Sequence, residues 1–378
     1  MDFETRRTEP KGDFPRETKG PVIIPIIQSS TKLLELGLPF DNDSMAFEER
    51  LELATRGTEE VVTERELREL LKGKSLKVYC GYEPSGKIHF GHASTVRKLM
   101  DFQKLGARTI VLLADLHAYL NDKGSLEEIR RIADYNKHCF IALGLDEKRT
   151  EFLLGSGFQL EPKYSMDVLR MAVGTTLLRA RRSMGMIARH LEDPDVAQVL
   201  YPLMQAVDMA WLDVDVAVGG IDQRKVHMVA REKLPALGYR KPVCVHMPLL
   251  HGLDGAEKMS SSKGNFIAVD DEPEVIEEKV KKAFCPPKVV KDNPVIDYAE
   301  HVVLPAVGRL EVRRPARYGG PIEISDSSEL RKLYAAGKLH PADLKAAVAS
   351  AVVELLAPVR NYFEGHPEAR LSKPSAVL

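Results

Sequence analysis

Short apolar runs rich in β-branched residues alternate with long helical patterns along most of this chain. Five of the runs are strand-like, and amphipathic patterns of helical period separate them. Such alternation predicts an α/β fold in which helices cover both faces of a Rossmann-type parallel sheet. Ligands of such sheets bind in the crevice at the carboxyl ends of the strands. The five runs are residues 76–80, 109–114, 151–154, 214–218 and 243–248.

Composition divides the 378 residues into three segments. Residues 1–44 are charged and contain several prolines around a short apolar patch at residues 22–27, so we expect a poorly ordered extension. Met45 is an alternative start. Residues 45–285 contain the alternating pattern and should form the main domain. The pattern then becomes mostly helical, so residues 286–378 should form a smaller second domain.

Capping signals mark two helices of the main domain. Thr63 with Glu66, and Ser125 with Glu128, match the capping box that begins a helix. The strongest helical pattern of the second domain covers residues 341–359.

A helical insertion is expected at about residues 164–200, where no strand-like run occurs. Its apolar side chains fit either a buried core or a contact between subunits, and we favour the core. They are Met166, Val168, Leu169, Met171, Ala172, Leu177 and Leu178.

Composition excludes several classes of protein. No apolar run approaches the roughly 20 residues that span a bilayer, and the start has no signal-peptide pattern, so we expect a cytoplasmic protein with no membrane segment. Four dispersed cysteines suggest buried thiols and neither a disulfide framework nor a zinc site. The net charge of −1 argues against nucleic-acid binding, although four arginines cluster within residues 309–317.

The first chemical motif, Pro-Ser-Gly-Lys-Ile-His-Phe-Gly-His at residues 84–92, follows the first apolar run and precedes an amphipathic helix. A turn of this kind binds phosphate, because the N–H groups at a helix N-terminus point outward. Glycines let the backbone approach the ligand, and His89 and His92 lie beside the turn. A weak metal site or a surface pair is the alternative for these two histidines.

The second motif, Lys-Met-Ser-Ser-Ser-Lys-Gly-Asn, occupies residues 258–265. A lysine and three hydroxyls can donate hydrogen bonds to the oxygens of a triphosphate. Gly255 and Gly264 flank the segment and should let it move, so we expect a mobile lid. A solvated loop is the alternative. Taken together, the two motifs indicate nucleotide chemistry.

A set of polar residues should form a second part of the site. Tyr201, Gln205 and Asp208 follow each other at positions i, i+4 and i+7, so they share one face of a helix. Their apolar neighbours indicate that this face is partly buried, whereas an exposed helix face is the alternative. The next apolar run ends in two glycines, which would deliver Asp222 and Gln223 to the same crevice.

In this order the two motifs resemble the HIGH and KMSKS signatures of class I aminoacyl-tRNA synthetases. Residues 81–92 and 113–120 are similar, almost residue for residue, to blocks of the tyrosyl-tRNA synthetases of archaeal and eukaryotic type, and the likeness extends over nearly all of residues 45–360. It implies a tyrosine–tRNA ligase that activates L-tyrosine with ATP and Mg²⁺, releases pyrophosphate, and transfers tyrosine to the 3′ end of tRNA(Tyr). Residues 45–285 would be the catalytic domain and residues 286–378 the anticodon-recognition domain.

The resemblance also assigns roles in the catalytic domain. Tyr79 and Asp208 would bind the substrate phenol, and Tyr201, Gln205 and Gln223 the α-amino group. His89, His92, Lys258 and Ser261 would be catalytic. Ser261 replaces a second lysine that many class I enzymes have, so more of the positive charge must come from Lys258, Lys263 or the metal. The ATP contacts would be Gly81, Glu83, His89, Gly91, His92, Gly220, Asp222, Lys258, Met259, Ser260, Ser261 and Ser262.

For the partners, the resemblance implies that Arg224 and Lys225 meet the acceptor stem of the tRNA. Tyr318 and His340 would sandwich the first anticodon base, and Asp343 would accept hydrogen bonds from it. The alternative for Asp343 is a cap on the last helix. The insertion would pack two subunits together, giving a homodimer.

Three other functions share parts of this sequence pattern. A tryptophanyl enzyme shares the fold and the block at residues 113–120, but Tyr79, Asp208 and Gln223 argue against it. A relative that has lost catalysis should have decayed motifs, whereas every expected position is filled here. A small nucleotidyltransferase would explain only the first motif.

Overall fold

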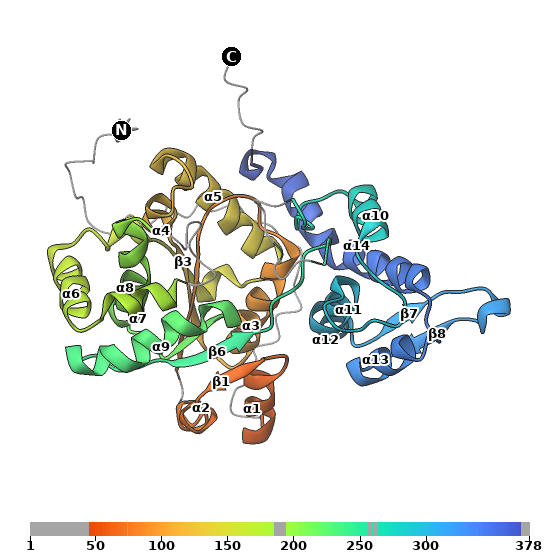
Figure 1. Cartoon of the computed structure of the whole chain (residues 1–378), viewed down its shortest axis with the longest axis horizontal. Helices are drawn as coiled ribbons and strands as arrows, with labels where there is room; N and C mark the ends of the chain where they lie inside the picture. The colour runs from red at the N-terminus through yellow and green to blue at the C-terminus, as the bar shows by residue number, and fades with distance from the viewer. Residues whose placement is uncertain (1–44, 74, 185–193, 256–258, 260–263, 372–378) are drawn as a thin grey trace, which may run out of the picture.

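The computed structural model describes residues 45–73, 75–184, 194–255, 259 and 264–371 (Figure 1). Several predictions concern residues outside these ranges. They are the N-terminal extension with its patch at residues 22–27, and Lys258, Ser260, Ser261, Ser262 and Lys263 of the second motif.

A six-stranded sheet with the order β1-β6-β5-β2-β3-β4 forms the centre of the fold. All neighbouring strands are parallel except β1, which pairs antiparallel with β6 at the edge. The five predicted strands are confirmed as β2 to β6, and the sequence analysis missed β1. The bounds are β1 Glu60–Val62, β2 Lys77–Tyr82, β3 Arg108–Leu113, β4 Thr150–Leu154, β5 Val216–Gly220 and β6 Val243–Met247.

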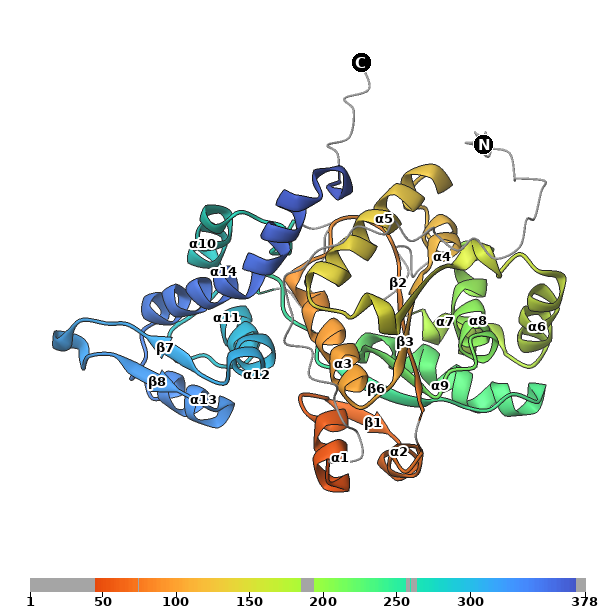
Figure 2. The same cartoon turned by 180° about the vertical axis from the view of Figure 1, so that it is seen from behind.

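Alternate residues of the strands serve two separate apolar layers. In β2, Val78 and Cys80 face the layer formed with α1, α3 and α5, whereas Tyr79 faces the layer formed with α6, α8 and α9. Figure 2 shows α3 and α5 in front of the sheet. Both faces are therefore covered, as predicted. The bounds are α1 Phe47–Thr55, α3 Ala93–Lys104, α5 Leu126–Ala142, α6 Pro162–Val173, α8 Val196–Trp211 and α9 Arg224–Lys233.

The strand order places a topological switch point between β2 and β5. From β2 the chain continues to β3 and β4 on one side, and from β5 it continues to β6 on the other. The loops after β2 and β5 therefore leave in opposite directions and open a crevice at their carboxyl ends.

The two predicted capping boxes have different outcomes. Ser125 and Glu128 form the complete box at the start of α5. At α2 (Glu64–Leu71), Thr63 accepts the N–H of Glu66 as expected. The carboxylate of Glu66 instead pairs with Arg231 at 2.6 Å and Lys241 at 2.8 Å, because these cations come close from α9 and from the segment before β6.

The C-terminal part of the chain forms a mostly helical lobe at one end of the molecule, opposite the α6 end (Figure 1). The long helix α14 runs from Pro341 to Gly365, six residues beyond the predicted end, and α10 packs against it. Whether residue 286 begins a separate domain stays a prediction. The lobe consists of α10 Pro273–Lys282, α11 Pro294–Tyr298, α12 Leu304–Val307, β7 Leu310–Val312, β8 Ile322–Ile324, α13 Ser327–Ala335 and α14.

The described part of the insertion is mostly helical, as predicted, but the preference for a buried core is wrong for four of the seven apolar residues to which it was applied. Val168 and Met171 are buried against α8, whereas four others are exposed because no part of the described chain covers that side of α6 and α7 (Leu177–Ser183). The exposed four are Met166, Leu169, Leu177 and Leu178.

The four cysteines and the apolarity of the helices can be assessed over all described residues. All four cysteines are buried thiols, in agreement with the prediction. No helix within the described residues combines the length and the apolarity needed to cross a bilayer.

Candidate active site

A cavity of about 550 Å³ opens at the carboxyl ends of the central strands. Its wall combines residues from the first motif, from α8 and from the end of β5, which the sequence analysis predicted to meet. The predicted residues that line it are Tyr79, Gly81, Glu83, His89, Gly91, His92, Tyr201, Gln205, Asp208, Gly220, Asp222, Gln223 and Met259.

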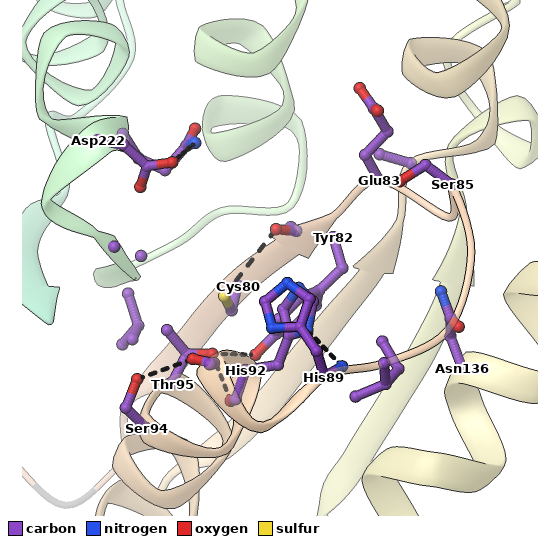
Figure 3. A pocket seen from close by; sticks show the side chains of 18 of the residues that line it. Cys80, Tyr82, Glu83, Ser85, His89, His92, Ser94, Thr95, Asn136 and Asp222 are labelled. Carbon is purple, nitrogen blue, oxygen red and sulfur yellow. Dashed lines mark hydrogen bonds between the residues drawn. The ribbon is translucent and has the colours of Figure 1, made fainter. Parts of the chain in front are cut away.

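The two histidines of the first motif lie on top of one another (Figure 3). The rings of His89 and His92 stack with their centroids 3.9 Å apart, and the backbone N–H of His89 donates to Nδ1 of His92 at 3.2 Å. A 3-10 turn at Phe90–His92 leads directly into α3, so the predicted strand-to-helix turn is confirmed. The hydroxyls of Thr95 and Tyr82 share a hydrogen bond of 2.9 Å, which joins the start of α3 to β2.

Backbone pairing holds the segment that follows the second motif beside the first motif. His89 forms an antiparallel bridge with Ala268, and the N–H of Phe90 donates to the carbonyl of Ile267 at 2.8 Å. Met259 is buried, and a side chain added at Gly91 would lie 3.5 Å from its sulfur. The described part of the second motif therefore reaches the turn that carries the histidines.

The glycines that flank the second motif have the backbone conformation for which glycine is suited. Gly255 has φ of 79° and Gly264 has φ of 67°, a region that other residues rarely adopt. The mobile lid itself falls on residues outside the described ranges and stays a prediction.

Asp208 is the most deeply buried acid of the cavity. Its Oδ1 accepts hydrogen bonds from Nε2 of Gln159 at 2.7 Å and from the hydroxyl of Tyr164 at 2.8 Å. Its Oδ2 has no hydrogen-bond partner among the described residues, and Nε2 of His117 lies 3.7 Å away. Burial raises the pKa of Asp208 to about 7 and lowers that of His117 to about 4. The carboxyl group thus holds one oxygen ready for a hydrogen-bond donor.

Tyr79 brings a phenol to the same wall of the cavity. The ring is 1% exposed, and burial raises the pKa of its hydroxyl, with a further contribution from the charge of Asp208. A Cβ built on Gly81 would lie only 2.4 Å from that hydroxyl. Gly81 is therefore required for the position of Tyr79, and this is a packing reason for glycine rather than a conformational one.

A chain of amides connects α8 with the end of β5. Nε2 of Gln205 donates to Oε1 of Gln223 at 3.1 Å, and Nε2 of Gln223 donates to Oδ2 of Asp222 at 3.3 Å. Oε1 of Gln205 is buried without a partner in the described chain. Tyr201 stands edge-on to the ring of His117, with centroids 4.5 Å apart. This wall offers acceptors to a cationic or hydroxyl-bearing ligand.

The residues predicted to contact tRNA lie outside the cavity. Arg224 and Lys225 begin α9 and are exposed, and Arg224 makes two hydrogen bonds to the carboxylate of Glu60 at 2.6 and 2.8 Å. Tyr318 is 60% exposed in the C-terminal lobe, with the guanidinium of Arg317 5.0 Å from its ring centroid.

The alternative function of Asp343 as a helix cap is wrong. His340 is the N-cap of α14, and its Nδ1 accepts the N–H of Ala342 at 3.2 Å. Asp343 follows in the first helical turn, where its carboxylate has no capping hydrogen bond among those found in the described chain. Asp343 is half-buried in the lobe, and its carboxylate is not used as a cap.

The residues that orient Asp208 were not predicted from the sequence. Gln159 and Tyr164 were given no role, and His117 was noted only as part of a block. One signal was available for Gln159, because a polar residue shortly after the end of β4 falls at the edge of the sheet where ligands bind.

Comparison with known proteins gives a consistent picture. Residues 71–357 match the family of class I tRNA synthetases (W and Y). The chain is 55% identical to a tyrosine–tRNA ligase of Methanopyrus kandleri over 318 residues, which is 84% of this chain and 98% of that protein.

Solved structures extend the comparison. The crystal structure of tyrosyl-tRNA synthetase from Archaeoglobus fulgidus complexed with L-tyrosine superposes with a TM-score of 0.80 and 57% identity, and covers 84% of this chain and 99% of that chain. A tryptophanyl-tRNA synthetase of Aeropyrum pernix has a TM-score of 0.66 over 86% of this chain and 87% of its own. At 23% identity, this second likeness shows the fold alone.

Proposed function

This chain belongs to the class I tRNA synthetases for tryptophan and tyrosine and functions as a tyrosine–tRNA ligase, and from this premise we propose how its side chains divide the reaction. One observation carries the proposal: Oδ2 of the buried Asp208 is unpartnered among the described residues while Oδ1 is held by Gln159 and Tyr164. A phenol hydroxyl can donate to that oxygen and accept from Tyr79. Asp208 and Tyr79 therefore select tyrosine.

This recognition accounts for the rejection of phenylalanine. A substrate without a hydroxyl leaves the buried carboxyl and phenol unpaired, which costs free energy that no other contact returns. Tyrosyl-tRNA synthetases are themselves the standard example of such discrimination. The same pair disfavours tryptophan, whose indole can donate but not accept.

We assign the α-ammonium of tyrosine to Tyr201, Gln205 and Gln223, which line the same cavity as Asp208 and offer oxygen atoms to it. An ammonium has three donors and no acceptor, so it needs oxygen or unprotonated nitrogen around it. Oε1 of Gln205 has no hydrogen-bond partner among the described residues, which supports this assignment.

ATP is the second substrate, and its triphosphate is assigned to the turn of the first motif. The tyrosine carboxylate attacks the α-phosphorus, the bond to the β-phosphate breaks, and pyrophosphate leaves with tyrosyl-adenylate retained. His89 and His92 donate to phosphate oxygens, as do Lys258, Ser260, Ser261 and Ser262. Gly81, Glu83, Gly91 and Met259 shape this part of the site. Gly220 and Asp222 contact the ribose. Displacement at phosphorus depends mainly on such positioning and charge stabilisation.

Mg²⁺ is assigned to the nucleotide rather than to a protein cage. Mg²⁺ typically keeps several waters and binds through substrate phosphates. The described residues fit this mode, since they contain no cluster of three His, Cys, Asp or Glu side chains that could hold a metal. The ion would supply positive charge to the phosphates.

In the second step the ester passes to tRNA(Tyr), when a hydroxyl of the terminal adenosine attacks the tyrosyl carbonyl and AMP leaves. We assign Arg224 and Lys225 to the acceptor stem, and Tyr318, His340 and Asp343 to the first anticodon base. Exposed aromatic and polar side chains suit single-stranded bases. Because translation consumes charged tRNA, the cytoplasm is the proposed place of action.

The exposed face of the insertion is assigned to a homodimer. Seven of the twelve exposed large apolar side chains of the described chain fall between residues 160 and 196. Exposed apolar side chains concentrated in one part of a chain are typical of an interaction site. Two copies related by a two-fold axis would cover this face with itself.

The decisive experiment is ATP–pyrophosphate exchange with each of the 20 amino acids, followed by charging of total tRNA. We expect exchange with tyrosine alone and charging of tRNA(Tyr). Exchange with tryptophan would assign the rival specificity. Absence of exchange with every amino acid would indicate a relative that has lost catalysis.

A further inference from the structure

Three residues form a row across the edge of the sheet. Glu60 of β1 pairs directly with His246 of β6, and His246 pairs in register with Gly219 of β5. Paired residues on neighbouring strands project their side chains to the same face. This is the face covered by α9, since Ala217 and Cys244, two residues away along their strands, belong to that layer.

His227 of α9 packs against Gly219 at the end of this row. A Cβ built on Gly219 would lie 3.2 Å from Cε1 of His227 and 3.2 Å from Cβ and Cγ of Gln223. Gly219 therefore makes room for both side chains. His227 is 1% exposed, and it lines the cavity together with Gln223.

Hydrogen bonds connect His227, His246 and Glu60 in series, and we call this series the relay. Nδ1 of His227 lies 3.1 Å from Nε2 of His246, and Nδ1 of His246 lies 3.1 Å from Oε2 of Glu60. The Glu60 carboxylate also receives the two hydrogen bonds from Arg224, which lower its pKa and keep it ionised.

The ionised carboxylate of Glu60 fixes the direction of every hydrogen bond in the relay. An ionised carboxylate can only accept, so His246 donates from Nδ1. Burial lowers the pKa of both histidines, that of His227 to about 3, so each ring is neutral and carries a single N–H. Nε2 of His246 must then accept from Nδ1 of His227. Nε2 of His227 is left as an unprotonated acceptor, with no hydrogen-bond partner in the described chain.

We propose that Glu60 and His246 are positioning residues that fix this tautomer, and that Nε2 of His227 accepts a hydrogen bond from the α-ammonium of bound tyrosine. This inference rests on the proposed function. The ammonium is favoured as the donor because Gln223 stands beside His227 above Gly219, and because Oε1 of Gln223 already accepts from Gln205. His227 therefore supplies a further acceptor beside Oε1 of Gln223, which already accepts a hydrogen bond.

Kinetics of His227→Leu provide the first test. We expect the KM for tyrosine to rise about tenfold in ATP–pyrophosphate exchange, with the KM for ATP unchanged. Glu60→Gln should give a smaller rise, because the amide can either accept from His246 as the carboxylate does or donate to it and reverse the relay, so the acceptor at His227 is lost only in part. The matched control is His138→Leu, which removes a histidine bonded to the hydroxyl of Tyr362 outside the cavity. A rise in the KM for ATP instead would overturn the assignment to the ammonium.

A competitor without the amino group separates direct contact from a structural effect. Desaminotyrosine keeps the phenol and the carboxylate but lacks the ammonium. Its inhibition constant should be the same for wild type and His227→Leu, while tyrosine binding weakens. An equal loss for both compounds would mean that His227 only supports the pocket, and the proposal would be wrong.

Nitrogen NMR tests the relay without any activity. With ¹⁵N-labelled histidine, His227 and His246 should both show a protonated Nδ1 and an unprotonated Nε2. Glu60→Gln should disturb both signals and leave that of His138 unchanged. A protonated Nε2 on His227 would overturn the proposal. Normal exchange with tyrosine alongside that result would leave the tyrosine–tRNA ligase function intact.

Discussion

The hydroxyl of Tyr164 donates to Oδ1 of Asp208 at 2.8 Å, so the carboxyl group is oriented before a substrate arrives. Nε2 of Gln159 adds a second bond to the same oxygen at 2.7 Å. Two donors on one oxygen leave the other oxygen for the ligand. Because the fold already orders this carboxyl group, tyrosine binding does not have to supply the free energy of ordering it, and the affinity for the substrate phenol is higher.

Asp208→Ala removes the group that distinguishes tyrosine. We expect kcat/KM for tyrosine in ATP–pyrophosphate exchange to fall about 100-fold, because a hydrogen bond to a charged group contributes about 1.5–3 kcal/mol. The KM for ATP should change little, and the preference for tyrosine over phenylalanine should shrink. Asp134→Ala, at an exposed aspartate of α5 outside the cavity, is the matched control. Kinetic constants for tyrosine within about threefold of wild type would disprove the substrate assignment.

The pKa of Asp208 predicts a pH dependence of stability. Its pKa is about 7 in the folded chain, against roughly 4 for an exposed aspartate. The folded state therefore holds the proton more tightly than the unfolded state between about pH 4 and 7. The stabilising contribution of this group is complete at low pH and is lost as the pH rises through about 7.

Asp208→Asn isolates this effect, because an amide does not ionise. The melting temperature of the variant minus that of the wild type, measured without ligands, should increase from about pH 5 to pH 8. Contributions from other groups cancel in the difference. A difference that stays constant with pH would show that Asp208 does not titrate in this range.

Gly81→Ala tests the close approach of Gly81 and Tyr79. An added methyl group would lie 2.4 Å from the Tyr79 hydroxyl, so the ring must shift. We expect the KM for tyrosine to rise roughly tenfold or more, since displaced catalytic geometry is costly, with a smaller change for ATP. The control is Gly365→Ala, where an added Cβ meets nothing within 4 Å. Tyrosine kinetics equal to those of the control would mean that the position of Tyr79 is not critical.

The proposed dimer predicts a change of mass. Leu177 and Leu178 are 69% and 58% exposed on α7, and Leu177→Glu combined with Leu178→Glu would place charges in the covered interface. Sedimentation should then report a monomer of about 42.2 kDa, where the wild type gives twice that mass. Val307→Glu changes an exposed valine in the C-terminal lobe and should leave the mass unchanged. Dimers in the double variant would place the interface elsewhere.

Buried parallel strands are the part of this fold that the sequence predicts best, because they appear as uninterrupted apolar runs. β1 escapes such an analysis, since its three residues are only half-buried and its place depends on pairing with β6. The face of Tyr201, Gln205 and Asp208 follows from helical spacing alone. Gln159 and Tyr164 reach Asp208 from 49 and 44 residues away, and only tertiary packing makes that contact.

The insertion shows a second limit of sequence analysis. Apolar residues at helical spacing predict that one side of a helix is covered, but they do not specify by what. Met171 is covered by α8, whereas Leu177 is exposed in the single chain. The same pattern thus serves an internal core and an external contact, and the choice between them depends on the arrangement of the helices.

Asp343→Ala and Lys258→Ala should have opposite kinetic profiles, because the two residues are assigned to different steps. Asp343 lies in the first turn of α14 and does not cap it, so its loss should cost only about 0.3–1 kcal/mol of stability. Charging of tRNA(Tyr) should fall roughly tenfold, with weaker discrimination at the first anticodon base, while tRNA-independent exchange stays near wild type. Lys258→Ala should depress both assays together, since its contact with the phosphates belongs mainly to the transition state of adenylate formation. Equal losses of exchange and charging in Asp343→Ala would make Asp343 a structural residue, and the C-terminal lobe would then be a scaffold and not an anticodon reader.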